Sequence, residues 1–277
     1  MNKILKFSNS EKFLKCPICN EELVLSKMSL YCTNKHCFDV SNSGYVNLTL
    51  NNRKQTYNKD SYLNRRAVFN TGYYSHILQE VINTLASINT VKTILDVGCG
   101  EGYYSREIYK KLRKEIIAFD ISKDSIQMAS KIDLSDSIKW FVGDLTQLPI
   151  KDNCIDCILD IFSPANYSEF RRVLVEAGYI IKVIRGNMHM VELRNIVSEY
   201  LRNQEYSNER IISLFKENCS FIYQKNVSAS YEITNDKLQV FTKMTPLLFN
   251  MSMNHKKHEF VEIPSLTIEG EILLGKV

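Results

Sequence analysis

Residues 94–102 read Ile-Leu-Asp-Val-Gly-Cys-Gly-Glu-Gly, and this stretch decides the fold. The apolar run 93–97 is followed by three glycines at alternate positions, and residues 105–112 then have a helical pattern. Glycine allows a sharp turn and a close approach of the backbone to a ligand. The stretch therefore predicts a strand, a ligand-binding turn and a helix.

The same alternation of strand and helix continues along the chain. Strands are expected at 116–119, 138–142, 157–162 and 179–184, with helices at 125–131 and 167–176. This order predicts an α/β fold with a parallel, doubly wound, Rossmann-like sheet. Two helices broken near Gly72 are expected in 61–85, helices at 188–202, 208–217 and 235–243, and extended segments at 221–232 and 266–274.

The glycine turn differs from a dinucleotide fingerprint in two respects. Gly102 comes one residue too early for Gly-x-Gly-x-x-Gly, and Asp96 precedes the first glycine. A carboxylate there receives a pyrophosphate poorly but tolerates a cation. S-adenosylmethionine has a sulfonium, an ammonium and no phosphate, so the turn favours this cofactor and a class I methyltransferase sheet.

Two further carboxylates follow the next strands of the predicted sheet. Asp120 ends the second strand, where it is able to accept both ribose hydroxyls, and Asp144 follows the third, near the adenine amino group. Carboxyl ends of parallel strands share one rim, so these groups are expected to lie together. The predicted cofactor residues are Asp96, Gly98, Cys99, Gly100, Glu101, Gly102, Tyr103, Asp120, Ile121, Asp144 and Leu145.

Four of the eight cysteines lie within residues 16–37. Cys16 and Cys19 form a Cys-x-x-Cys pair, and Cys32 and His36 follow at the spacing of a tetrahedral structural zinc site. Cys37 is a rival fourth ligand. Cys154 and Cys157 form a second, isolated pair, for which core packing is the better interpretation.

The chain of 277 residues is 44% hydrophobic and 24% charged, which is ordinary for a globular protein. No apolar run is long enough for a membrane span, and the first ten residues lack a secretion signal, so a cytoplasmic protein without membrane association is expected. Residues 1–12 are expected to be a flexible leader. The predicted domains are a zinc-binding, RNA-recognising module at 1–50, a helical linker at 51–88 and the methyltransferase domain at 89–277.

The positive charge gathers at the N-terminal end. Residues 1–70 hold 11 Lys and Arg against 5 Asp and Glu, whereas the remainder holds 24 against 26. Such asymmetry suggests a polyanionic partner, although a solvated lysine-rich surface is an equal alternative. Phosphate contacts are expected from Arg53, Lys54, Lys59, Arg65 and Arg66, with ordinary surface charge as the alternative.

Several motifs together carry a family resemblance. They are the zinc-ligand pattern above, Phe38-Asp39, residues 44–48 (Gly-Tyr-Val-Asn-Leu), Arg65-Arg66, the glycine turn extended by Tyr103-Tyr104, Phe162-Ser163-Pro164 and Met244-Thr245-Pro246. In this order they resemble the RlmA family of bacterial 23S rRNA guanine-N1-methyltransferases across almost the whole chain. Residues 163–172 resemble the Gram-positive branch, which is associated with resistance to tylosin-type macrolides.

The resemblance implies structural Zn²⁺ on Cys16, Cys19, Cys32 and His36, and S-adenosylmethionine on the residues given above. It also implies a target guanine in a hairpin of domain II of 23S rRNA, and a homodimer whose zinc modules grip the RNA. The chain departs from the family pattern at Cys37, where a polar residue is usual, and at Asp160, where the Gram-positive branch tends to have Asn.

Methylation at guanine N1 requires loss of the N1 proton. Asp160 is the candidate base, and a carboxylate that only caps the strand end or hydrogen-bonds a neighbouring turn is the alternative. The segment from Asp160 to Pro164 is not the Asn-Pro-Pro-aromatic motif used on exocyclic amines, which favours a ring nitrogen. Stacking on the base or packing in the core is expected, with equal weight, for Tyr103, Tyr104, Phe162 and Tyr167.

Three other functions remain as alternatives. The first two are a methyltransferase that acts on tRNA and a methyltransferase that acts on a small metabolite, which would need no basic N-terminal end. The third is a non-catalytic RNA-binding protein. Such a protein would tolerate a damaged glycine turn or the loss of Asp120, but the glycine turn is intact and Asp120 is retained.

Overall fold

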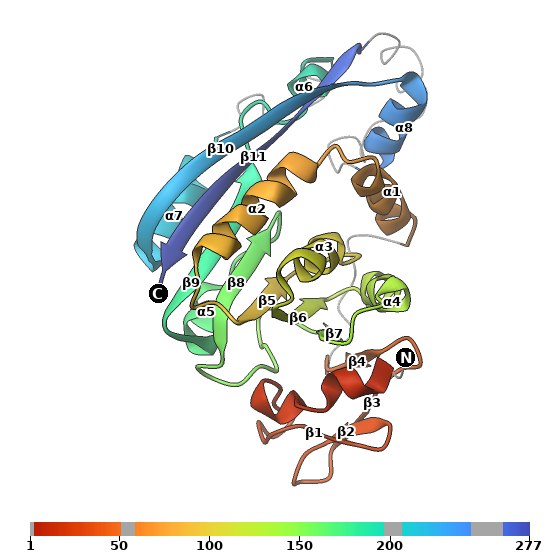
Figure 1. The fold of residues 1–277 in the computed structure, drawn as a ribbon, viewed down its shortest axis with the longest axis vertical. Helices are drawn as coiled ribbons and strands as arrows, with labels where there is room; N and C mark the ends of the chain where they lie inside the picture. Colours follow the sequence, from red (N-terminus) through yellow and green to blue (C-terminus); the bar gives the residue numbers. More distant parts are fainter. Residues whose placement is uncertain (1–2, 51–58, 197–206, 245–262) are drawn as a thin grey trace.

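The computed structural model describes residues 3–50, 59–196, 207–244 and 263–277. A small N-terminal module lies against one end of a larger α/β unit (Figure 1). The described residues of this module form two 3₁₀ helices and four short strands. These are η1 (Lys3–Phe7), η2 (Ser10–Lys12), β1 (Val24–Ser26), β2 (Ser29–Tyr31), β3 (Cys37–Asp39) and β4 (Tyr45–Asn47).

The α/β unit begins with two helices, α1 (Lys59–Asn70) and α2 (Ser75–Ser87). The glycine turn then joins β5 (Thr93–Val97) to α3 (Tyr103–Leu112), as predicted. The remaining elements are β6 (Glu115–Asp120), α4 (Lys123–Ile132), β7 (Ile138–Val142), β8 (Ile155–Ile161), α5 (Tyr167–Val173), β9 (Leu174–Arg185), α6 (Val191–Ile196), α7 (Glu209–Asn218), β10 (Ser220–Glu232), α8 (Asn235–Met244) and β11 (Ser265–Lys276).

The strands β5 to β11 and β4 of the N-terminal module form one eight-stranded sheet in the order β10-β11-β9-β8-β5-β6-β7-β4. The doubly wound, Rossmann-like prediction is confirmed, and the sheet departs from an all-parallel one at β11, which is antiparallel to both of its neighbours. The long β10–β11 pair extends past the other strands toward α6 and α8 (Figure 1). The strand order reverses at β5, because β6 and β8 lie on opposite sides of it. Such a reversal leaves a crevice at the carboxyl ends of the central strands.

Side chains alternate between two hydrophobic cores on the two faces of the sheet. In β6, Ile116 and Ala118 join the core covered by α2, α3 and α4, whereas Ile117 and Phe119 join the opposite core. The opposite core is covered by α5, by Phe215 of α7 and by the N-terminal module. The strands of a doubly wound sheet are buried on both faces, which explains their nearly continuous apolar runs.

The N-terminal module shares its core with the sheet. Phe7 and Leu14 are fully buried in the cluster that contains Phe119 and Phe141. β4 pairs in parallel with β7 and becomes the edge strand of the main sheet. The expectation of a flexible leader at residues 1–12 is wrong for residues 3–12, because the two 3₁₀ helices bury Phe7 against the sheet.

The domain boundaries predicted at residues 50 and 88 stay predictions. The structure adds that β4, which precedes the first boundary, and α2, which precedes the second, both pack into the α/β unit. The helix predicted at 188–202 is described only as α6, because residues 197–206 lie outside the described part of the chain, as do Arg53 and Lys54.

A buried ion pair joins the module to the α/β unit. Lys6 Nζ contacts Asp133 Oδ2, and the exposed fractions of the two side chains are 2% and 3%. The indole Nε1 of Trp140 donates to the same carboxylate at 2.8 Å. Removal of one partner from such a pair leaves a buried charge uncompensated.

We expect Asp133→Asn to lower the free energy of unfolding by about 3–5 kcal/mol, because the Lys6 ammonium then has no counter-charge. Urea unfolding followed by fluorescence measures this change, since Trp140 is the single tryptophan and lies beside the pair. Asp236→Asn, at an exposed position of α8, is the matched control and should change stability little. Equal stability of both variants would contradict the assignment.

Candidate active site and metal centre

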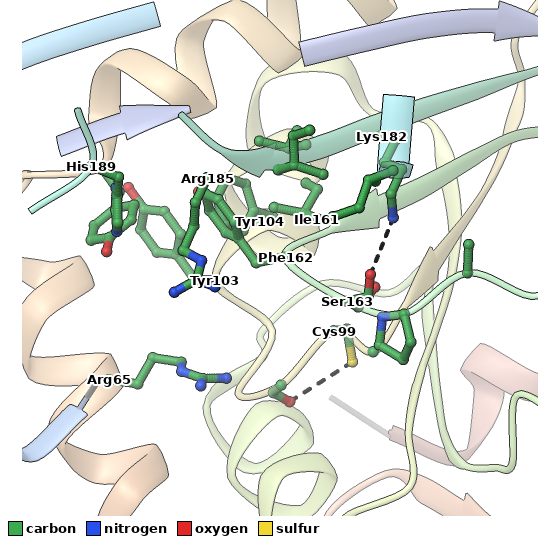
Figure 2. Close-up of a pocket in the computed structure, with 18 of the residues that line it drawn as sticks. Arg65, Cys99, Tyr103, Tyr104, Ile161, Phe162, Ser163, Lys182, Arg185 and His189 are labelled. Atoms are coloured by element: carbon green, nitrogen blue, oxygen red, sulfur yellow. Dashed lines mark hydrogen bonds between the residues drawn. The ribbon is translucent and has the colours of Figure 1, made fainter. Parts of the chain in front are cut away.

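A pocket of about 570 Å³ opens at the carboxyl ends of β5, β8 and β9. Its floor is the glycine loop, residues 98–102, and its other walls come from α1, from the segments that follow β8 and β9, and from α7 (Figure 2). Its volume lies within the range of pockets that hold small-molecule cofactors. Five of the predicted cofactor residues line it: Gly98, Cys99, Gly100, Glu101 and Tyr103.

The glycine loop has a shape that side chains would obstruct. Gly98 and Gly102 have φ values of +64° and +78°, in the left-handed region. A Cβ on Gly102 would lie 2.4 Å from the Trp140 ring, and one on Gly98 would lie 2.9 Å from Ser163 Cβ. The loop therefore packs tightly against the protein on one side and presents backbone to the pocket on the other.

Two carboxylates hold this loop from behind. Asp96 is buried and accepts a hydrogen bond from Ser105 Oγ of α3 at 2.5 Å. Burial raises the pKa of Asp96 to about 7, and the Ser105 hydroxyl opposes this rise. Asp120 accepts from the backbone N–H of Gly100 at 3.0 Å and from that of Ser122 at 2.8 Å. Burial also raises the pKa of Asp120, and these N–H donors act in the opposite direction.

The other predicted cofactor residues lie at the same sheet edge without lining the pocket. Ile121 is exposed directly after β6. Asp144 and Leu145 are half-buried after β7, where Asp144 Oδ1 accepts from the backbone and hydroxyl of Thr146. Tyr62 of α1 is buried beside Asp120, a neighbour that raises its pKa in addition to burial.

The pocket wall contains buried polar atoms that have no hydrogen-bond partner within the described chain. Among them are Tyr104 Oη and Glu101 Oε1. The other oxygen of Glu101 pairs with Arg106 at 2.9 Å. Unpartnered buried polar groups are costly and call for a ligand. One hydroxyl and one carboxylate oxygen fit a ligand with a carboxylate and an ammonium, as in the methionine part of S-adenosylmethionine.

The four aromatic residues that the sequence singled out all line the pocket. Tyr103 stacks on Phe69 of α1 with a centroid distance of 4.7 Å, so it is a packed wall. Tyr104 and Tyr167 are buried, whereas Phe162 is 38% exposed. Phe162 also has a φ of +54°, a strained conformation for a bulky residue at the end of β8.

Asp160 lies at the end of β8 and is fully buried. Its Oδ2 accepts from Lys182 Nζ at 2.6 Å, and its Oδ1 contacts Ser163 Oγ at 2.6 Å. Burial raises the pKa of Asp160, and Lys182 opposes this rise. Ser163 also lies 2.8 Å from the carbonyl of Val97, so this network ties the end of β8 to the end of β5.

The pocket contains functional residues that the sequence did not indicate. Four arginines line it, and three of them, with His189, come from the chain after β8. His189 follows the fifth predicted strand as Asp120 and Asp144 follow the second and third, so the strand-end rule was the signal that pointed to it. Arg65 is one of the predicted phosphate contacts, whereas no local pattern distinguishes Arg185, Arg194 and Arg210 from surface charge.

The predicted metal ligands converge in the N-terminal module. The ligand atoms of Cys16, Cys19, Cys32 and His36 all lie within 4.8 Å of one another. His36 Nδ1 lies 3.5 Å from Cys16 Sγ and 3.4 Å from Cys32 Sγ, and Cys19 Sγ lies 3.6 Å from Cys32 Sγ. Ligands about 2.0–2.3 Å from one zinc ion are this far apart in a tetrahedron. The donor set therefore fits Zn²⁺.

The sequence left two questions about cysteines: whether Cys37 is a metal ligand, and whether Cys154 and Cys157 only pack in the core. Cys37 is exposed, and its Sγ contacts Asp39 Oδ1 at 3.8 Å, away from the four-residue cluster. Cys157 is fully buried in the core covered by α2, α3 and α4, and half-buried Cys154 packs against the core on the opposite face of the sheet. Burial raises the pKa of both the Cys154 and the Cys157 thiol, as expected for packing residues.

Within the described residues no helix is long and apolar enough to span a bilayer. The eight-stranded sheet, the glycine loop at the end of its central strand and the pocket above it define a class I methyltransferase fold. In agreement, residues 94–182 match the family of methyltransferase domains, and residues 14–56 match the N-terminal zinc ribbon of RlmA.

Two proteins that match this chain along almost its whole length identify a family within the class I methyltransferases. YxjB of Bacillus subtilis, provisionally named a 23S rRNA (guanine-N1)-methyltransferase, is 31% identical over 99% of both chains. The 23S rRNA (guanine(748)-N1)-methyltransferase of Streptomyces fradiae is 25% identical over 93% of both. The chain thus belongs to the RlmA-type family of 23S rRNA guanine-N1-methyltransferases.

The fold is also found in distant solved structures. The methyltransferase solved in complex with the Trm112 activator of Haloferax volcanii has a TM-score of 0.51 at 14% identity, with 80% of this chain and 99% of that chain covered. A SAM-dependent methyltransferase of Aquifex aeolicus has a TM-score of 0.50 at 13% identity, with 79% and 99% covered. At this level of identity they support the fold alone.

We expect Cys16→Ser to lose bound metal and to unfold the N-terminal module, because metal binding and folding are coupled in such small modules. Cys37→Ser is the matched control, since Cys37 lies outside the cluster, and it should keep the metal content of the wild type. Elemental analysis of the purified proteins measures both. Loss of metal from the Cys37 variant, or retention in the Cys16 variant, would refute this ligand set.

Proposed function

We propose that the protein transfers a methyl group from S-adenosylmethionine to N1 of a guanine in 23S rRNA. The observation that carries the proposal is the charge of the pocket beside the glycine loop. Four arginines and Lys182 line it, and Glu101 is the single carboxylate among its described lining residues. Such a surface suits a substrate with phosphate groups. The names of the relatives in Bacillus and Streptomyces supply the base and the atom.

The cofactor would occupy the floor of this pocket. In this proposal the backbone of residues 98–102 faces the cofactor, and Glu101 and Tyr104 face its amino-acid part. Asp120 receives the ribose hydroxyls through the lone pairs that Gly100 and Ser122 leave available, since each carboxylate oxygen accepts two hydrogen bonds. Asp144, Leu145 and Ile121 flank the adenine, and Asp96 supports the loop.

When bound, S-adenosylmethionine supplies a methyl group on a positively charged sulfur. The protein must hold guanine N1 in line with that methyl group, which is a matter of position more than of covalent chemistry. Phe162 lies exposed at the end of β8, where it is able to stack on a base extruded from the RNA. Ser163 and Lys182, which contact Asp160, fix the loop that carries Phe162.

Asp160 itself is assigned a positioning role in this proposal. Both of its oxygens have partners in the described chain, and it is not among the residues that line the pocket. A base must come within hydrogen-bond reach of the proton that it takes. The alternative interpretation of Asp160, a carboxylate that bonds a neighbouring turn, therefore receives the better support.

In this proposal Zn²⁺ on Cys16, Cys19, Cys32 and His36 stabilises the module that contacts RNA. Its lysines, together with Lys59, Arg65 and Arg66 of α1, contribute to the positive excess of the N-terminal region. The domain II hairpin, the homodimer and macrolide resistance follow from the family resemblance, and the cytoplasmic location follows from the hydrophobic pattern of the sequence; all four stay predictions.

The proposed product has a direct test. Methylation at N1 blocks the Watson–Crick edge of guanine, so reverse transcriptase stops one nucleotide before it. We expect one stop in 23S rRNA from the parent strain that is absent from a deletion strain and returns with the wild-type gene. Identical stops in all three strains would refute the proposal. A tRNA substrate predicts the stop in tRNA, and a metabolite enzyme or a non-catalytic RNA-binding protein predicts none.

We expect Asp120→Asn to weaken S-adenosylmethionine binding by about 10- to 100-fold, the usual effect of losing a hydrogen bond to a charged group. The amide has one acceptor oxygen and cannot accept from both Gly100 and Ser122. Isothermal calorimetry measures the affinity, and Asp124→Asn, in the first turn of α4, is the control. Unchanged affinity in the Asp120 variant would exclude this residue from the cofactor site.

We expect the double variant Arg185→Ala, Arg210→Ala to bind rRNA more weakly and to reduce the slope of log affinity against log salt by about 1.5–2, the value for two lost phosphate contacts. Both arginines are exposed and line the pocket. The control is Lys110→Ala, Lys111→Ala at the end of α3 distant from the pocket. An equal salt slope in the wild type and the arginine variant would exclude these phosphate contacts.

A further inference from the structure

One histidine of the pocket wall, His189, has no role in the proposed reaction, although its hydrogen bonding is defined by the structure. His189 lies in the segment between β9 and α6 and lines the pocket. In Figure 2, His189 and Arg185 lie on one side of the pocket, and Cys99 of the glycine loop lies on the other. His189 thus belongs to the side that would face the methyl acceptor.

The backbone fixes the tautomer of this imidazole. The N–H of Glu269 in β11 donates to His189 Nδ1 at 3.2 Å. A ring nitrogen that accepts a hydrogen bond carries no proton, so the proton of the neutral ring is on Nε2. Burial lowers the pKa of His189 to about 4, and the positive charges of Arg185 and Arg194 act in the same direction. The ring is therefore neutral near pH 7.

The Nε2–H group is left for a ligand. Within the described residues no protein group forms a hydrogen bond with Nε2. The nearest rings are Tyr74, with a centroid distance of 6.1 Å, and the exposed Phe162, at 6.3 Å. A buried donor on the wall of a pocket, beside an aromatic ring able to stack on a base, is placed to read the edge of that base.

We propose that His189 is a catalytic residue whose Nε2–H donates a hydrogen bond to O6 of the target guanine. This inference rests on the proposed function. As guanine loses its N1 proton to water, the negative charge spreads from N1 onto O6, and a donor at O6 stabilises it. The N1 electron pair then forms the new bond to the methyl carbon, and the pair of the breaking carbon–sulfur bond stays on sulfur.

This donor has two consequences for the reaction. A preorganised donor at a developing oxyanion contributes about 10²- to 10³-fold to kcat in other enzymes. It also selects the base, because guanine has an acceptor at position 6 and adenine has an amino donor there. Two donors facing each other leave both unpaired, which a buried site tolerates poorly.

Two isosteric variants separate the donor from the tautomer-fixing contact. In His189→Asn the side-chain oxygen takes the place of Nδ1 and accepts from Glu269, but no donor reaches the position of Nε2. In His189→Gln the amide nitrogen takes the place of Nε2. We expect His189→Asn to lose about 10²-fold in kcat, and His189→Gln to stay within about 10-fold of the wild type. Both should bind S-adenosylmethionine with wild-type affinity.

The measurement is single-turnover methylation of 23S rRNA by the full-length protein, with 1-methylguanine quantified in the digested product. Equal kcat values for the two variants, with 1-methylguanine formed, would overturn the role of His189 and leave the proposed function intact. Absence of 1-methylguanine from the wild-type reaction would overturn both.

The pH–rate profile of the wild type is an independent test that needs no variant. A neutral donor with a pKa near 4 does not titrate between pH 5.5 and 8, so the rate should rise with pH as guanine N1 deprotonates, and any inflection near pH 7, where buried Asp96 titrates, should be the same in the wild type and in His189→Gln. An acidic limb with an apparent pKa of about 6.5, the ordinary value for histidine, that disappears in His189→Gln would identify His189 as a base and overturn the donor role.

Discussion

The hydrogen bonds between Asp120 and the backbone of the glycine loop are the constraint on which the pocket depends. Asp120 ends β6, and its carboxylate accepts from Gly100 in the loop that follows β5, so it joins two neighbouring strand ends. Asp96 of β5 accepts a hydrogen bond from Ser105 of α3 and so joins this strand to the helix that follows the loop. Burying two carboxylates so close together costs free energy, which the raised pKa of each records. Backbone donors offset that cost, and the arrangement leaves the opposite face of the loop for a ligand.

The pocket is built partly from the matched methyltransferase domain and partly from segments that lie outside that match. The methyltransferase-domain match ends at residue 182 and begins at residue 94. The glycine loop and the end of β8 lie inside these bounds, whereas Arg65 and Phe69 precede them and Arg185, His189 and Arg210 follow them. In the proposed function, the side of the pocket that holds the cofactor is therefore built from the shared domain. The side that holds the substrate is then built from the flanking segments, which is where a change of substrate would have to be encoded.

The secondary structure followed from the sequence because periodicity is local. β5 and β7 have the predicted bounds, and α5 differs by ending at Val173, three residues before the predicted end of the helix, because β9 begins at Leu174. The zinc ligands followed from spacing for the same reason. The hydrogen bond that orients His189 had no local signal, because its partner Glu269 is 80 residues away and comes beside it only through the insertion of antiparallel β11 next to β9. The same limit applies to Lys6, whose partner Asp133 is 127 residues away.

The two sides of the pocket have opposite charge, and this division suits a reaction between a cation and a polyanion. Asp96, Asp120 and Glu101 lie in and behind the loop, whereas the arginines are on the walls from α1, β9, α6 and α7. A cofactor with a sulfonium is favoured on the acidic floor, and a phosphate backbone is favoured along the basic walls. Transfer of the methyl group converts the sulfonium to a neutral thioether, so the acidic floor holds the product less strongly than the substrate. The same charges that order the two reactants thus weaken the hold on the spent cofactor once the reaction is complete.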